Sequence, residues 1–123
     1  MYANRETVSI TTGASSGAGT GYTGVVNGRI LSIQYVKTDF TDGSTMTVTG
    51  EETGTAIWSE TGVNASTVRA PRMATHSTAG AAALYAAGGT AINDYITIAN
   101  ERVKIEVTSA GNSKTGTYYV LWG

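Results

Sequence analysis

The sequence predicts an all-β fold: a single compact β-sandwich or jelly-roll-like barrel of about eight short antiparallel strands. Apolar side chains recur at every second position in several short runs, which is the period of a strand with one buried face. Turn-forming glycine, asparagine and aspartate residues separate these runs, as they do in sandwiches and barrels. The chain has 123 residues, the usual size of one domain, so we expect residues 1–123 to share one hydrophobic core.

Five runs carry the alternation. Their apolar positions are Val8 and Ile10; Leu31, Ile33 and Tyr35; Met46 and Val48; Ile96 and Ile98; and Val103, Ile105 and Val107. The positions between them are mostly threonine, whose branched β-carbon suits a pleated surface. Residues 1–6 are expected to form a short N-terminal arm, residues 13–24 a flexible glycine-rich loop, and residues 110–116 a hairpin between the last two strands.

The run from Thr117 to Trp122 differs from the others because it is apolar on both faces. A strand with one solvated face would alternate. Apolar residues on both faces indicate either a central strand that is covered on both sides or a strand that faces a partner chain.

The alanine-rich segment from Ala79 to Ala87 is ambiguous. Its composition allows one or two helical turns, which Gly88 and Gly89 would end. The same small side chains are also compatible with a strand.

The composition argues against several classes of function. The chain has no cysteine and a single histidine, so a zinc site is not expected. Its net charge is -1, without the basic stripe of a nucleic-acid-binding protein. No apolar run approaches the roughly 20 residues of a membrane span, and no signal peptide is recognised, so we expect synthesis in a cytoplasm and no membrane contact. Only 14% of the residues are charged, well below the usual quarter, which indicates surfaces covered by something other than water.

One motif suggests a nucleotide site. Residues Thr12 to Gly19 resemble the phosphate loop of short-chain dehydrogenases and follow an apparent strand. That loop needs a helix immediately afterwards, so that the amide end of the helix faces the phosphates. Here more glycines and two valines follow, and no lysine stands four residues after a tyrosine. We therefore interpret this segment as a hairpin tip.

Other catalytic arrangements are equally incomplete. His76 has only Thr75 and Ser77 beside it, and neighbours on a strand point to opposite faces. Glu51 and Glu52 would diverge for the same reason, so they do not form a glycosidase pair. The sequence predicts no enzyme, no metal site and no cofactor.

Arginine and aromatic residues are the candidates for contact with another protein. Pro71 marks an edge or a loop, and the arginines on either side of it are typical of interfaces. The candidate interface residues are Tyr2, Arg5, Arg69, Arg72, Tyr118, Tyr119 and Trp122.

Three parts of the chain carry a resemblance to a known family. They are residues 1–8, which lead straight into a strand; residues 28–36; and residues 99–107, followed by the glycine turn and strand start of residues 111–117. Together they resemble small virion proteins encoded among the head genes of tailed bacteriophages. The likeness spans most of the chain, but it consists of strands and glycine turns.

The resemblance implies a capsid decoration (cement) protein or a minor capsid protein on the surface of the virion. Such proteins are compact β domains, often trimers, that bind the major capsid protein or other virion proteins where capsomers meet. The family has no catalytic motif to transfer to this chain. Two alternatives stay open: a head–tail connector, tail or spike-base component, and a carbohydrate-binding β-sandwich that uses Trp58, Trp122 and the tyrosines.

Overall fold

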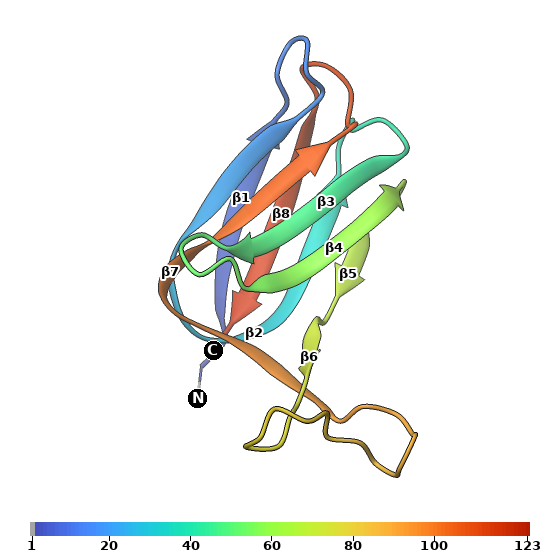
Figure 1. Ribbon diagram of the computed structural model, residues 1–123. Coiled ribbons are helices and arrows are strands. Elements are labelled where there is room, and N and C mark those ends of the chain that lie inside the picture. The colour runs from blue at the N-terminus through green and yellow to red at the C-terminus, as the bar shows by residue number, and fades with distance from the viewer. Residues whose placement is uncertain (1) are drawn as a thin grey trace.

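The computed structural model describes residues 2–123 and confirms an all-β fold of eight antiparallel strands (Figure 1). No helix occurs in this range. The strands are β1 (Asn4–Thr11), β2 (Gly19–Lys37), β3 (Ser44–Gly50), β4 (Ala56–Val63), β5 (Thr67–Arg69), β6 (Arg72–Ala74), β7 (Asn93–Thr108) and β8 (Thr115–Trp122).

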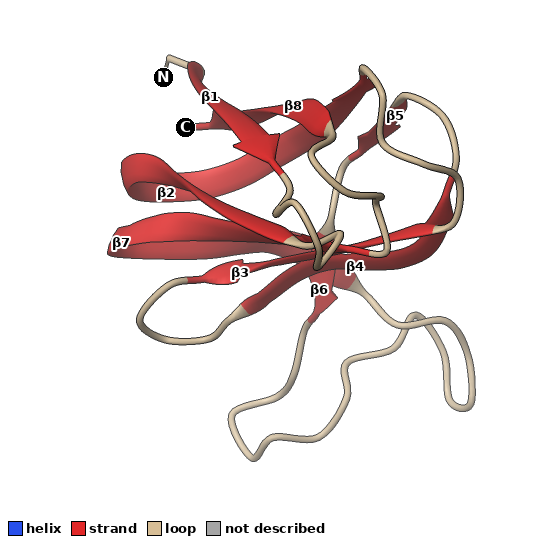
Figure 2. Ribbon diagram, turned by 90° about the horizontal axis from the view of Figure 1, so that it is seen from above, coloured by secondary structure: helices blue, strands red, loops and turns tan. Residues whose placement is uncertain are grey.

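The strands form one open sheet in the order β1-β8-β2-β7-β3-β4, with β5 on β2 and β6 on β7. This sheet folds over into two layers because β2 and β7, with 19 and 16 residues, are longer than the short strands expected and belong to both layers (Figure 2). The first layer contains β1, β8, the C-terminal half of β2, and β5. The second layer contains the N-terminal half of β2, the C-terminal half of β7, β3 and β4.

The two long strands bend at the same place. The ladder between β2 and β7 shifts register between Val26 and Gly28. On β7, Asn100 has a φ of 55°, a left-handed conformation that asparagine tolerates, and its N–H donates to the Asn27 side chain at 2.7 Å. Gly28 has a φ of 155°, which L side chains rarely adopt, and a Cβ there would lie 3.1 Å from the carbonyl carbon of Gly123, so the bend favours a glycine at this position.

The core lies between the layers. It is built from the inward residues of both layers, with Tyr35, Phe40 and Tyr118 as its largest fully buried side chains. The rings of Tyr35 and Phe40 stack with centroids 5.9 Å apart, and the ring of Tyr118 is tilted by 31° against that of Tyr35 with centroids 5.2 Å apart. Aromatic contacts of this kind add to the free energy gained by burial alone.

The alternating runs are strands, and most of their apolar residues face the core. Leu31 is an exception. The ladder between β2 and β8 shifts between Ile30 and Ser32, so Ile30 is buried and Leu31 is only half-buried. A bulge reverses the facing of the residues around it, and a simple alternation does not reveal it.

Two links that the sequence presents as hairpins cross between the layers instead. The chain from β1 to β2 and the chain from β7 to β8 join strands that are not paired with each other. The glycine-rich loop is shorter than residues 13–24, because β2 begins at Gly19. Likewise, residues 4–6 of the expected N-terminal arm lie in β1, and residue 1 is outside the described residues.

The two links lie side by side and are joined through Thr12. Its hydroxyl donates to the carbonyl of Gly111 at 2.6 Å and accepts from the N–H of Lys114 at 2.8 Å. The backbone adds bonds from Thr12 N–H to Lys114 O and from Ala110 N–H to Gly17 O. Thr12 is buried and its partners are half-buried, so these bonds are partly shielded from water.

We expect Thr12→Val, which keeps the shape of the side chain, to lower the free energy of unfolding by about 1 kcal/mol, because it leaves the partly buried N–H of Lys114 and carbonyl of Gly111 without this partner. Urea denaturation monitored by tryptophan fluorescence measures the loss. Thr11→Val is the matched control, since Thr11 is exposed. An equal effect at both positions would show that the hydroxyl of Thr12 adds nothing.

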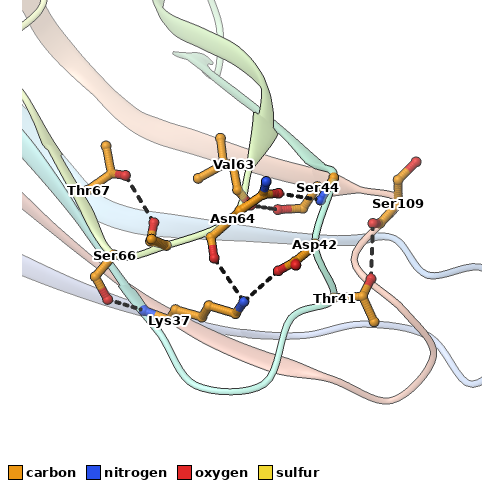
Figure 3. Close-up of polar contacts among 11 residues, drawn as sticks. Lys37, Thr41, Asp42, Ser44, Val63, Asn64, Ser66, Thr67 and Ser109 are labelled. Atoms are coloured by element: carbon orange, nitrogen blue, oxygen red, sulfur yellow. Dashed lines mark hydrogen bonds and ion pairs between the residues drawn. The ribbon is translucent and has the colours of Figure 1, made fainter.

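A second cluster of polar side chains connects the two layers through hydrogen bonds at the end of β2 (Figure 3). The Nζ of Lys37 donates to Asp42 Oδ1 and to the carbonyl of Asn64, both at 2.9 Å. The side-chain oxygen of Asn64 accepts from the N–H of Gly43 at 2.7 Å, and Ser44 donates to the carbonyl of Val63. The cluster joins the end of β2 to the start of β3 and to the link between β4 and β5, which is a structural role.

Candidate protein-binding surface

A long excursion between β5 and β7 stands away from the sandwich at one end (Figure 1). We call residues 72–94 the arm. Backbone hydrogen bonds hold it: Thr75 N–H to Ile92 O at 2.8 Å, Ala83 N–H to Thr75 O at 3.0 Å, and Ile92 N–H to Ala83 O at 3.0 Å. The arm thus consists of short extended runs that meet through two tight turns.

Residues 79–87 form neither the helix nor the strand that the composition allowed: they consist of turns and two isolated bridge positions, Ala82 paired with His76 and Leu84 paired with Ala91. Gly80 and Gly88 both have positive φ values and form the turns. A helix of this length is marginal in water unless one of its faces packs against the protein. No such packing surface is available here, so the backbone satisfies its hydrogen bonds within the arm instead.

The arm has an unusual surface for a segment in water. None of its residues is buried, and only Thr75, Ala83, Ala91 and Ile92 are half-buried. Met73, Leu84 and Tyr85 are exposed, Tyr85 by 75%. Between Arg72 and Asp94 there is no acidic residue, lysine or arginine. A segment with so much exposed apolar surface and no formal charge is typical of a surface that another protein covers.

Tyr95 anchors the base of the arm. The guanidinium of Arg72 lies 4.1 Å from the ring centroid of Tyr95, and that of Arg29 lies 4.8 Å from it. Arg72 also donates to the carbonyl of Leu31 at 3.3 Å. Cation–π contacts at partly exposed sites contribute about 0.5–1 kcal/mol each, so the arm is attached to β2 as well as to β7.

The outer side of the first layer is a second unusual surface. Its residues follow from the register of the strands and from their alternation with buried residues. We call this surface the neutral face; it consists of Arg5, Thr7, Ser9 and Thr11 on β1, Thr115, Thr117, Tyr119 and Leu121 on β8, Ser32, Gln34 and Val36 on β2, and Val68 on β5.

One charged residue lies on the neutral face. It is Arg5, whose guanidinium lies 5.3 Å from the ring centroid of Tyr119. A row of paired residues across the strands runs from Thr7 through Tyr119 and Gln34 to Val68. Val68 is 59% exposed.

The outer side of the second layer, the charged face, provides an internal comparison. Lys104 and Glu106 form an ion pair on β7, and Arg102 pairs with Glu51. Arg102 also lies 4.2 Å from the ring centroid of Tyr22. Charged residues at these positions suit an ordinary solvated surface. The two outer faces of the same sandwich therefore differ in charge.

The candidate interface residues predicted from the sequence fall into different places. Arg5 and Tyr119 meet on the neutral face, and Tyr2 is 89% exposed just before β1. Arg72 lies at the base of the arm. Arg69 binds both carboxylate oxygens of Glu60, at 2.8 and 2.9 Å, and joins the edges of the two layers. This contact lowers the pKa of Glu60, together with a hydrogen bond from Trp58.

The remaining two candidates belong to the interior. Tyr118 is fully buried in the core, so no partner can touch it in this conformation. Trp122 is half-buried and packs against the core, and its Nε1 has no hydrogen-bond partner among the described residues. The apolar residues of 117–122 therefore lie on both sides of β8: Tyr118 and Val120 face the core, while Tyr119 and Leu121 face outward.

Glu101 is the one acidic side chain that is buried among the described residues. Its carboxylate accepts hydrogen bonds from the N–H of Thr53 at 3.1 Å, the hydroxyl of Thr53 and the N–H of Glu52 at 3.0 Å. These donors, led by the N–H of Thr53, lower the pKa of Glu101. The carboxylate fixes the turn between β3 and β4, which explains its burial without a catalytic role.

Residues 2–123 contain no cavity and no group of side chains that could hold a metal ion. Over the same range no helix is long and apolar enough to cross a membrane. Residues 13–18 form a link between two strands, and β2, which begins at Gly19, follows them rather than a helix.

Sequence reasoning missed the arm as a candidate surface. The signal is a run of 21 residues, 73–93, without a lysine, arginine, aspartate or glutamate. A stretch of this length without any charged residue can be recognised in the sequence as a candidate contact surface. Comparison of the chain with protein-family models, with curated proteins and with solved structures finds no match.

Proposed function

We propose that this protein is a structural component of a bacteriophage particle, a capsid decoration protein that binds the outer surface of the head and stabilises it. It acts by contact with other proteins and assembles as a homo-oligomer. Two things support the proposal. Residues 1–8, 28–36 and 99–117 resemble small head-associated virion proteins, and the fold exposes surfaces that are suited to contact with another protein.

The observation that carries the binding role is the arm. It presents a charge-free surface with Leu84 and Tyr85 exposed, on a sandwich whose own core does not need it. Ordering a segment costs conformational entropy, and contact with a partner offsets that cost. Many copies of a small contact stabilise a lattice through avidity, without high affinity at each site.

The carbohydrate-binding alternative is less favoured by the geometry. A sugar platform needs aromatic rings that lie flat and open on the surface. Trp58 is buried and donates to Glu60 at 3.1 Å, and Tyr118 is in the core. The connector, tail or spike-base alternative uses the same protein-binding surfaces and differs in copy number.

Copy number per particle tests the proposal. Gradient-purified particles from the source lysate are analysed by quantitative mass spectrometry, with an abundant host protein as the control for carry-over. We expect many copies in a simple ratio to the major capsid protein. A few copies per particle would replace decoration with a connector, tail or vertex position, and absence from the particles would overturn the virion role.

A further inference from the structure

We infer that copies of this chain associate head to tail, with the arm of one copy packed on the neutral face of the next. The inference rests on the proposed role as a protein-binding module and names the surfaces and the partner. It concerns the purified chain, so it is tested without the phage particle.

The arm and the neutral face of one copy cannot cover each other. The arm leaves the sandwich on the side away from β1 and β8, as Figure 2 shows, whereas the neutral face is the outer side of these strands. Both surfaces are uncovered in the single chain. A contact between them therefore requires two copies.

The two surfaces match in charge and chemistry. The arm has no formal charge between Arg72 and Asp94, and the neutral face has Arg5 alone, which is already engaged with Tyr119. Packing one on the other would bury a single charged group, the guanidinium of Arg5, which keeps its contact with the Tyr119 ring, so little charge is removed from water. On the charged face the same contact would remove two ion pairs from water, Arg102 with Glu51 and Lys104 with Glu106, which costs more.

The size of the two surfaces sets the expected strength of the contact. A standard interface uses about 20–30 residues on each side; all but four of the 23 residues of the arm are exposed, and the neutral face consists of 12 residues, so we expect a small interface and weak association. Tyr85 and Leu84 provide the large side chains that such contacts need at their centre. The hydroxyls and amides of the neutral face, among them Gln34 and Thr117, provide hydrogen-bond partners for the arm backbone.

A contact between two different surfaces has a consequence for assembly. Each copy offers one arm and one face, so the contact repeats and forms either a closed ring or an open chain. A symmetric face-to-face dimer would instead use one surface twice. The two arrangements respond differently to paired variants.

Two variants separate the surfaces, each with a new positive charge on an exposed side chain. Tyr85→Lys alters the arm, and Gln34→Lys alters the centre of the neutral face, next to Tyr119 and Val68. Thr47→Lys on the charged face, opposite Glu106, is the matched control. Circular dichroism first confirms that all three variants keep the fold.

Sedimentation velocity of the full chain over a wide range of concentrations provides the measurement. We expect the unaltered protein and Thr47→Lys to self-associate, and each of the other two variants to raise the dissociation constant about tenfold or more. An equimolar mixture of Tyr85→Lys and Gln34→Lys retains one intact arm and one intact face, so it should form a 1:1 dimer that neither variant forms alone and that grows no further.

A mixture that stays monomeric, or an unaltered chain that is monomeric at every concentration, would overturn the inference and leave the arm to a different protein. Unchanged association in both variants would overturn it as well. None of these results bears on whether particles contain the protein. Conversely, absence from particles would remove the proposed function and leave a self-associating chain.

Discussion

Replacing Tyr118 with alanine is expected to lower the free energy of unfolding by about 4 kcal/mol, whereas replacing it with phenylalanine should raise it by about 1 kcal/mol. The ring is fully buried beside Tyr35, so its loss leaves a cavity. The hydroxyl has no hydrogen-bond partner among the described residues. Burying an unpaired hydroxyl is unfavourable, and phenylalanine removes it while the ring contacts stay in place.

Urea denaturation of the two Tyr118 variants measures both effects. Tyr119→Phe is the matched control, because Tyr119 is the next residue on β8 and lies on the outer face; we expect little change there. A loss of more than 1 kcal/mol in Tyr118→Phe would mean that the hydroxyl is satisfied, for example by a buried water molecule. The same reasoning applies to the hydroxyl of Tyr35, which also lacks a partner among the described residues.

Stability is expected to fall above pH 10, with Tyr35 alone accounting for a loss of about 2 kcal/mol between pH 10 and pH 12. Burial, reinforced by the negative charge of Asp39, raises the pKa of Tyr35 to about 12. Burial, reinforced by Tyr35, also raises the pKa of Tyr118. In the unfolded chain both phenols lose a proton near pH 10. The unfolded state then binds fewer protons than the folded one, so raising the pH favours unfolding.

Tyrosinate absorbance and urea denaturation across this pH range test the prediction together. Two of the seven tyrosines should ionise only as the protein unfolds. The double variant Tyr35→Phe and Tyr118→Phe should remove much of the alkaline loss and leave the neutral-pH fold intact. Ionisation of all seven tyrosines near pH 10 in a folded protein would contradict the burial of these two hydroxyls.

Much of the fold was predictable because the layers follow local patterns. The alternation at Val103, Ile105 and Val107 identifies the inward side of β7. The run 117–122 is a central strand of its layer, between β1 and β2, but its outer side with Tyr119 and Leu121 is not covered within the single chain, so the alternative of a strand that faces a partner chain stays a prediction. The long strands were not predictable. The N-terminal half of β2 is rich in glycine and reads as a loop, yet it is a strand because β7 supplies a ladder for it.

The candidate surfaces were less predictable for a related reason. Which residues of β8 face outward depends on its register with β1 and β2, which is set by contacts far apart in the sequence. Tyr118 and Tyr119 are indistinguishable as letters, but one is buried and the other lies on the neutral face. The arm has no buried residues, so its sequence shows no regular spacing of apolar positions that would distinguish a helix from a strand. Its composition alone was compatible with both.

The position of β8 between β1 and β2 affects when the protein can fold. The side chain of Asn4 bonds the carbonyl of Trp122, a residue 118 positions later in the chain. At ordinary rates of translation the ribosome needs on the order of ten seconds to synthesise the residues between Asn4 and Trp122, so the contact cannot form earlier. Until β8 is synthesised the first layer lacks its central strand, and β1 has no strand to pair with. The nascent chain is therefore most exposed to proteolysis and aggregation in that interval, and slow folding through distant contacts is expected.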